Sequence, residues 1–144
     1  MKIKIVKMRS EAIIPQYQTA LAAGFDLHAA TSDDIVIKPG KFVAIPIGLA
    51  MEIPAGYELQ IRPRSGLAYK NGVTMLNGVG TIDADYRGEM QGLLINHSGK
   101  DFVVTPGMRI AQGVITKHET AEWVEVGALS ETERGAGGFG STGE

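Results

Sequence analysis

The sequence predicts an all-β fold, a single-domain antiparallel jelly-roll-like barrel or sandwich with at most one short helix. Runs rich in β-branched and aromatic residues recur about every ten residues along the chain, a spacing typical of such folds. Glycine, proline, asparagine and serine stand between the runs, where turns are needed. No amphipathic segment of about ten residues separates the runs, which argues against a parallel sheet with crossover helices.

Six strands are predicted in the first part of the chain. They are Lys2–Met8, Phe25–Ala29, Asp34–Lys38, Phe42–Ile47, Leu49–Ile53 and Tyr57–Arg62. Polar and apolar residues alternate in the first and third of these runs, as they do in strands with one buried face. Pro39-Gly40 and Pro54-Ala55-Gly56 supply turns before the fourth strand and the sixth.

Five more strands follow a segment, Ser65–Lys70, that can form a short helix with Ser65 as its N-cap. They are Val73–Leu76, Gly88–Asn96, Phe102–Thr105, Arg109–Lys117 and Glu122–Val126. Asn71-Gly72, Ser98-Gly99 and Pro106-Gly107 mark the turns between them. Open antiparallel sheets have edges, so the last strand is a candidate for pairing with another subunit.

Composition narrows the class of protein. A net charge of −2 with interspersed signs gives no basic field for a nucleic acid, so we expect no such partner. The absence of cysteine excludes disulfides, and three histidines without ligand spacing disfavour zinc. The most apolar stretch, 42–53, is too short and too interrupted to span a bilayer, and the N-terminus lacks a signal-peptide core. We therefore expect a cytoplasmic or otherwise intracellular protein without membrane association.

The end of one predicted strand carries groups that suit an anion. Arg62-Pro63-Arg64-Ser65-Gly66 brings together guanidinium groups, a hydroxyl and backbone N–H groups at the start of the predicted helix. The alternative is a solvated strand end followed by an ordinary helix cap.

The segment from Asn77 to Glu89 contains three carboxylates, an asparagine and a tyrosine. Asp83 follows the apolar Ile82, and an ionised carboxylate beside a substrate can position and deprotonate a water molecule. A solvated acidic turn explains the same composition.

Single polar residues occur on two other predicted strands. Asp26 stands between apolar neighbours, and is either a group that supports a site or a buried residue bonded to a turn. Arg109 and Gln112 share another strand, and each of these residue types, met singly, is more often structural than functional.

The last eleven residues, 134–144, include five glycines and cannot build a packed core. Arg134 can pair with phosphate, Phe139 has a flat apolar face, and Gly140-Ser141-Thr142 offers hydroxyls and unobstructed N–H groups. Glycine-rich nucleotide motifs are excluded because no strand and helix flank the segment and the P-loop lysine is missing. We divide the chain into a β domain, 1–133, and a flexible C-terminal segment, 134–144, that is either a disordered end or a lid.

Five segments, in order, resemble the five motifs of the trimeric dUTP diphosphatase (dUTPase) family. They are Ala23–Leu27, Pro63–Ala68, Gly80–Gly88, Arg109–Gln112 and Arg134–Gly143. Each motif is weak alone, but five in sequence over most of the chain are specific. The resemblance implies an enzyme that hydrolyses dUTP to dUMP and diphosphate, which removes dUTP from the nucleotide pool and supplies the dTMP precursor. It also implies a homotrimer whose active sites lie between subunits.

The resemblance further implies roles for individual residues. Asp83 would activate the attacking water, and Tyr86 would pack on the deoxyribose and disfavour a ribose 2′-hydroxyl. The phosphate chain would be held by Arg64, Ser65, Gly66 and Gln112, the uracil by Asn77, Thr81, Ile82 and Gln91, and the closed lid would contribute Arg134, Phe139, Gly140, Ser141 and Thr142. Mg²⁺ would be bound mainly by substrate phosphates and water, with Asp26 contributing at most through water.

Two other functions remain open at this point. A related pyrimidine-nucleotide deaminase of the same fold would use a carboxylate in amino-group chemistry and release ammonia from dCTP. A nucleotide-sensing module would bind dUTP without turnover. Asp83, Tyr86 and the aromatic glycine-rich tail favour the hydrolase.

Overall fold

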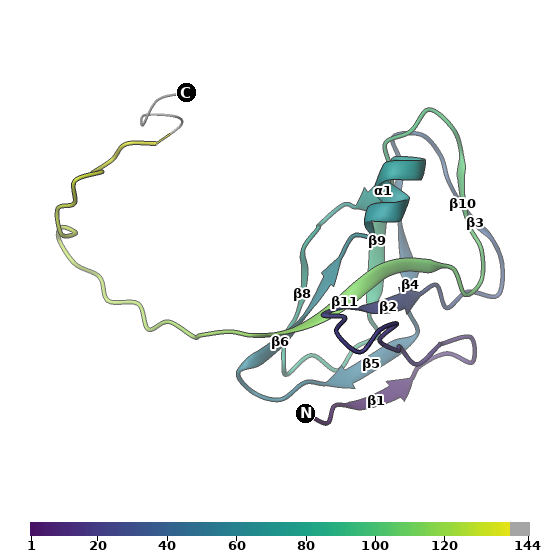
Figure 1. Ribbon diagram of the computed structural model, residues 1–144, viewed down its shortest axis with the longest axis horizontal. Coiled ribbons are helices and arrows are strands. Elements are labelled where there is room, and N and C mark those ends of the chain that lie inside the picture. The colour runs from purple at the N-terminus through teal and green to yellow at the C-terminus, as the bar shows by residue number, and fades with distance from the viewer. Residues whose placement is uncertain (139–144) are drawn as a thin grey trace.

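Short antiparallel strands and one short helix make up the part of the chain that the structure, a computed structural model, describes, residues 1–138. The strands wrap into a jelly-roll-like barrel, with the helix at one end and the chain after residue 118 leaving from the other (Figure 1). The nearly all-β fold predicted from turn spacing is confirmed.

The elements follow the predicted order. They are β1 (Lys4–Lys7), β2 (Phe25–His28), β3 (Ile35–Ile37), β4 (Phe42–Pro46), β5 (Leu49–Glu52), β6 (Tyr57–Arg62), α1 (Ser65–Asn71), β7 (Val73–Met75), β8 (Gly80–Ile82), β9 (Gln91–Asn96), β10 (Phe102–Val104) and β11 (Arg109–Lys117).

Four small sheets form the barrel, and all their strand pairs are antiparallel. The largest has the order β2-β11-β6-β8, and a second has the order β4-β9-β7. The pairs β1-β5 and β10-β3 complete the wall. The largest sheet matters most for function, because three of the five segments singled out in the sequence overlap its strands and a fourth, Pro63–Ala68, directly follows β6.

Alternation along the strands places the core. In β6, Leu59 and Ile61 are buried whereas the intervening Gln60 is half-buried, and in β9 the residues Gly92, Leu94 and Asn96 point inward. Each large aliphatic side chain that is fully buried stabilises the fold by about 1.5–3 kcal/mol. The core therefore fixes the strand registers on which the site depends.

Asn96 is a polar residue with no solvent exposure, and it joins three parts of the wall. Its Nδ2 donates to the carbonyls of Ile37 (2.8 Å) and Lys100 (2.7 Å), and its Oδ1 accepts from Ser98 N (2.9 Å). All its bonding capacity is thus used inside the protein, as a buried amide requires.

Within the barrel, two local predictions were wrong and one strand was missed. Ser65 is not the N-cap of α1: Arg64 occupies that position in an extended conformation, because its carbonyl accepts the first helical N–H bonds. The strand predicted from Gly88 begins only at Gln91, since residues 83–90 form turns. The short strand β8 was not predicted at all.

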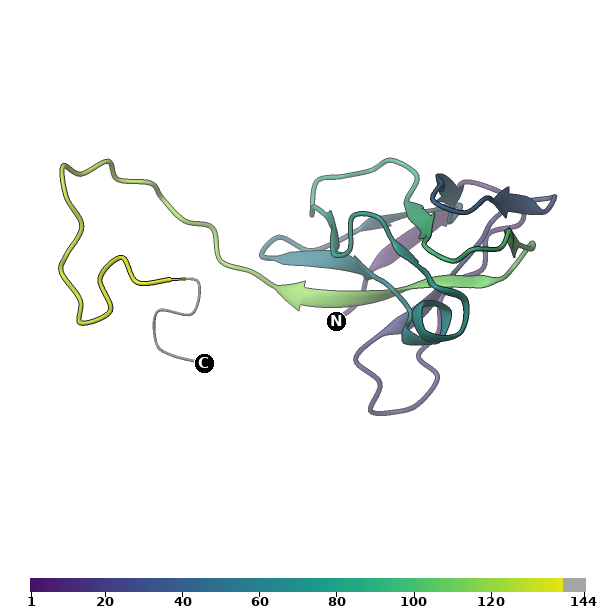
Figure 2. The same ribbon diagram turned by 90° about the horizontal axis from the view of Figure 1, so that it is seen from above.

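The C-terminal arm, residues 119–138, contains no helix or strand, so the predicted strand Glu122–Val126 is absent from the chain on its own. Figures 1 and 2 show the arm running away from the barrel after β11. Its apolar side chains lie in solvent, with Trp123 90% and Leu129 87% exposed. Among residues 1–138, no helix has the length and apolarity needed to cross a membrane.

Candidate active site

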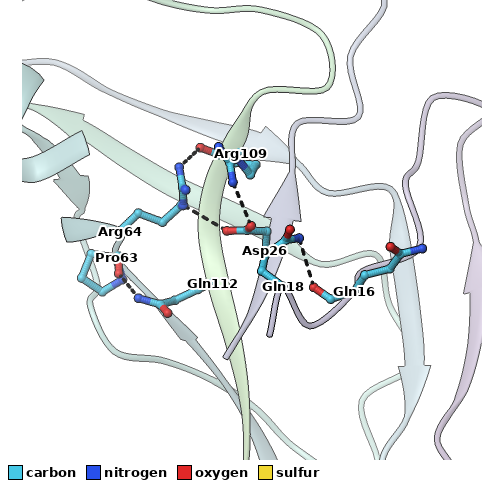
Figure 3. A network of polar contacts seen from close by, with 7 residues as sticks. All are labelled: Gln16, Gln18, Asp26, Pro63, Arg64, Arg109 and Gln112. Carbon is cyan, nitrogen blue, oxygen red and sulfur yellow. Dashed lines mark hydrogen bonds and ion pairs between the residues drawn. The ribbon is translucent and has the colours of Figure 1, made fainter. Parts of the chain in front are cut away.

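Asp26 lies at the centre of a charged cluster at the end of the largest sheet (Figure 3). Its side chain is only 11% exposed, and Arg64 Nε lies 3.1 Å from Oδ1 while Arg109 Nη1 lies 3.3 Å from Oδ2. Arg64 Nη1 also donates to the carbonyl of Arg109 at 3.1 Å. One carboxylate thus faces two guanidinium groups, which leaves one positive charge uncompensated within the cluster.

Strand register brings these residues together. Gln112 of β11 lies opposite Asp26 of β2 on one side and opposite Arg62 of β6 on the other. Gln112 Nε2 donates to the carbonyl of Pro63 at 2.9 Å, which ties the chain leaving β6 to β11 (Figure 3). Arg64 then follows at the N-cap of α1, where its side chain can reach back to Asp26.

The hairpin that carries Asp83 belongs to the same sheet as this cluster but lies at its opposite edge. β8 pairs with β6 so that Ile82 faces Leu59, Thr81 faces Gln60 and Gly80 faces Ile61. Asp83 follows the last residue of β8 and is exposed. Because β8 runs antiparallel to β6, Asp83 lies at the end of β6 remote from Arg64, and a site that uses both groups needs the Asp26 cluster of one subunit and the β8 hairpin of another.

Tyr86 stands in the turn after Asp83 and is held by the backbone around it. Its N–H donates to the Asp83 carbonyl at 3.2 Å, and its hydroxyl donates to the Glu89 carbonyl at 3.1 Å. A Cβ added at Gly88 would lie 2.9 Å from Cε2 of Tyr86, closer than real Cβ contacts. Gly88 thus allows the ring to fold back over the turn, while 43% of the residue stays exposed.

Glu89 closes this turn with an ion pair to a distant part of the chain. Arg9 Nε donates to Glu89 Oε1, and Arg9 Nη2 donates to Oε2 at 3.2 Å. Bidentate arginine–carboxylate pairs fix orientation as well as distance. The N-terminal segment is thereby tied to the turn that carries Tyr86.

His28 follows Asp26 on β2 and faces Arg109 in the register of β11. Burial is the main cause that lowers the pKa of His28 below 6.5; Arg109 and Arg64 lower it further and Asp26 opposes them. Its Nδ1 is buried and has no hydrogen-bond partner among the described residues. The imidazole is therefore held in its neutral form more strongly than in the unfolded chain.

Within residues 1–138, the remaining predicted site residues form no side-chain hydrogen bond or ion pair with the Asp26 cluster. Ser65 and Gly66 are exposed in the first turn of α1, and Asn77 is exposed between β7 and β8. Gln91 begins β9 opposite Pro46, and its side chain makes no hydrogen bond within residues 1–138. Arg134 bonds to the Gly137 carbonyl inside the arm at 2.9 Å. Phe139, Gly140, Ser141 and Thr142 lie outside the described residues.

Sequence reasoning missed three members of this arrangement. Arg109 was placed in the fourth motif but given no role of its own, although its position opposite His28 on an adjacent strand brings it to Asp26. The Pro63 carbonyl, which Gln112 binds, leaves no trace in side-chain composition. The pairing of Arg9 with Glu89 joins residues 80 positions apart, and only strand topology could have revealed it.

The acidic residues of the site do not form a ligand set for a metal. Both oxygens of Asp26 face arginines, and within residues 1–138 no three His, Cys, Asp or Glu side chains gather as potential ligands. Any divalent cation would have to draw most of its oxygen ligands from a bound substrate and from water.

Comparison with known proteins shows which family the chain belongs to. A family model described as dUTPase matches residues 10–143. The deoxyuridine 5'-triphosphate nucleotidohydrolase of Nautilia profundicola is 60% identical over 144 residues and covers 100% of both chains. That of Helicobacter pylori (strain J99) is 53% identical, covering 99% of this chain and 97% of its own. The solved structure of Staphylococcus bacteriophage 80alpha dUTPase with dUPNHPP has a TM-score of 0.86 and 26% identity, and covers 99% of each chain. Full-length identity of this degree, with the family's fold, shows that the chain belongs to the dUTPase family.

Proposed function

We propose that the chain hydrolyses dUTP to dUMP and diphosphate at sites shared between subunits, where the Asp26 cluster of one chain meets the β8 hairpin of another. The observation that carries the proposal is the pairing of two arginines with one buried carboxylate, in a sheet whose opposite edge presents the exposed Asp83. A triphosphate can bind the excess positive charge, and the aspartate can act on a water molecule.

In this proposal each part of the substrate meets a different element. Arg64, with Ser65, Gly66 and Gln112, binds the phosphate chain, because these groups converge where β6 passes into α1. The β8 hairpin, with Asn77, Thr81, Ile82 and Gln91, reads the uracil, and its backbone groups would be left without partners by cytosine. Tyr86 packs on the deoxyribose.

Asp83 supplies the chemistry. Its exposed carboxylate accepts a proton from the water that attacks the phosphate chain, and phosphoryl transfer asks the protein chiefly for position and charge stabilisation. Mg²⁺, held by substrate phosphates and water, would add charge neutralisation. Asp26 acts as the counter-ion of two arginines, with at most a water-mediated contact to the cation.

A homotrimer with shared sites completes the proposal. The arm exposes Trp123, Val124, Val126 and Leu129, which the barrel it leaves does not cover. The barrel in turn has an apolar groove of about 510 Å³ lined by residues of β1, β5 and β11 and of the segment before β2. Exposed apolar surface of this kind marks an interface. Residues 134–144 would then close as a lid over a site in the assembly, and an intracellular location fits a substrate drawn from the nucleotide pool.

A hydrolysis assay with dUTP, dCTP and UTP in the presence of Mg²⁺ tests the proposal. We expect diphosphate release from dUTP and no ammonia from dCTP. Ammonia release would favour the deaminase, and tight dUTP binding without turnover would favour a sensing module. Light scattering on the same sample should give the mass of three chains.

A further inference from the structure

We propose that Arg9 is a positioning residue for Tyr86 and, through it, for the discrimination of deoxyribose from ribose. The inference rests on the proposed function, because that function places the Tyr86 ring against the sugar. Arg9 lies far from every substrate-binding segment in the sequence, and it acts only through the turn that carries Tyr86.

The first step is the ion pair between Arg9 and Glu89. Both carboxylate oxygens of Glu89 accept bonds from the guanidinium group, and the Glu89 side chain is only 21% exposed. The exposed pair of Lys4 with Glu52, by contrast, has side chains that are 81% and 49% exposed. The Arg9 side chain is itself 44% exposed, so the pair lies at the surface, and its two-point geometry and the shielded Glu89 carboxylate make it the stronger restraint of the two.

The second step is the peptide group between Glu89 and Met90. Its carbonyl accepts the Tyr86 hydroxyl at 3.1 Å, and its N–H donates to the Leu49 carbonyl at 2.9 Å. A peptide group is planar, so these two bonds share one orientation. The ion pair restrains the same residue from its side chain, and so holds the carbonyl at the position that the Tyr86 hydroxyl requires.

The third step is the frame that carries both partners of the ion pair. Met8 N donates to the Gly48 carbonyl at 2.8 Å, and Ile47 N donates to the Met90 carbonyl at 3.0 Å. Gly48 adopts a positive φ of 71°, and a Cβ there would lie 2.9 Å from the Cβ of Ala12. The turn between β4 and β5 thus holds the Arg9 segment and the Glu89 segment side by side.

The Tyr86 turn contains little else that could fix the ring. Arg87 Nη1 donates to the carbonyls of Ala84 (2.7 Å) and Tyr86 (3.0 Å), which shapes the backbone of the turn. Gly88 leaves space beneath the ring instead of holding it. Within the described residues, the hydroxyl bond to Glu89 is the one polar contact of the Tyr86 side chain. Loosening Glu89 should therefore widen the positions that the ring can take.

Arg9→Met in the full-length protein tests the proposal, with kcat/KM measured for dUTP and for UTP. We expect the preference for dUTP over UTP to fall by at most about fivefold, the upper end of the range for a surface ion pair, while turnover of dUTP falls much less. Tyr86→Phe should lower the preference as well, and Arg9→Met should cause no further loss in that background. Additive losses, or an unchanged preference in Arg9→Met, would overturn the proposal.

Matched variants separate positioning from general damage. Lys4→Met removes an exposed ion pair from another strand and should leave the preference unchanged. Arg9→Lys keeps the charge but not the two-point geometry, and should lose less of the preference for dUTP than Arg9→Met does. If Arg9→Met does not fold, an equal preference in Arg9→Lys and in the unaltered protein overturns the proposal. If the unaltered protein does not prefer dUTP over UTP, the proposed function fails instead.

Discussion

The carboxylate of Asp83 is exposed and receives no side-chain hydrogen bond from the described residues, whereas both oxygens of Asp26 face arginines. A general base must be free to accept a proton and close to water, and of these two aspartates Asp83 meets both needs. In the proposed mechanism Asp26 instead holds Arg64 and Arg109 where a phosphate chain can bind them. Two identical side chains thus have different tasks because their surroundings differ.

Asp83→Asn should lower kcat for dUTP by roughly 10²- to 10⁴-fold, because the amide keeps the shape but cannot accept the proton. The dissociation constant for dUTP should change little, since no binding contact is removed. Steady-state kinetics and calorimetric titration measure the two quantities. Asp85→Asn, an exposed carboxylate two residues away, is the control. Equal losses of binding and turnover in Asp83→Asn would make Asp83 a structural residue.

His28 should make the stability of the fold depend on pH. Its pKa in the folded protein lies below 6.5, chiefly because of burial, so the unfolded chain binds the proton more tightly. Its contribution is fully present above pH 6.5 and is lost as the pH falls from there through the folded pKa. Urea unfolding measures the free energy of unfolding between about pH 7.5 and pH 5.5. Its slope against pH should therefore be smaller in His28→Gln than in the unaltered protein. His97→Gln replaces an exposed imidazole and serves as the control; equal slopes in both variants would contradict the assignment.

At the scale of elements, β3, β9 and the turn before β10 depend on one amide. Asn96→Ala removes the donor to the Ile37 and Lys100 carbonyls and the acceptor of Ser98 N, and among the described residues only the Lys100 carbonyl keeps a second side-chain donor, Ser98 Oγ at 3.1 Å. We expect a loss of about 3 kcal/mol in the free energy of unfolding, since each buried group left unsatisfied costs about 1–3 kcal/mol. Chemical denaturation measures it. Asn71→Ala, at the exposed end of α1, should cost far less, and similar losses in the two variants would contradict this role for Asn96.

Strand positions could be predicted because alternation and turn residues are local signals. Leu59 and Ile61 of β6 alternate with polar residues, and the turns at Gly40, Gly56 and Gly107 have the positive φ that favours glycine. β8 is only three residues long and follows a glycine-rich turn, so it is too short to show the alternation of polar and apolar residues that marks a strand. Ser65 was expected as the N-cap from residue type alone, whereas the ion pair of Arg64 with Asp26 fixes the chain one residue earlier.

At the scale of the whole molecule, the proposed function assigns residues 134–144 and the barrel different contributions to a shared site. In that proposal a variant that lacks residues 134–144 keeps the base Asp83 but has no lid, and Asp83→Asn keeps the lid but has no base. Each alone should be nearly inactive and folded. If the lid of one subunit closes the site of another, refolding the two variants together should restore activity at a level set by the fraction of mixed trimers. No recovery in assembled mixtures would mean that each lid serves its own subunit.

The members of the site could be predicted largely from the five-motif resemblance, and their connections could not. Asp26, Arg64 and Gln112 were singled out from the sequence, but that Asp26 binds two arginines follows from the register of β2 with β11. The link from Arg9 to Glu89 depends on how the turn at Gly48 packs, which involves residues far apart in the chain. Local patterns identify reactive groups; long-range packing decides their partners.

The chain contains a single tryptophan, Trp123, and it is 90% exposed on the arm. Its fluorescence therefore reports on the arm alone, without a contribution from another indole in the barrel. An emission maximum that moves to shorter wavelength as the protein concentration rises would record burial of the arm against another copy, and a second change on adding a nucleotide would record closure. Assembly and substrate capture can thus be followed in the unmodified protein with one optical signal.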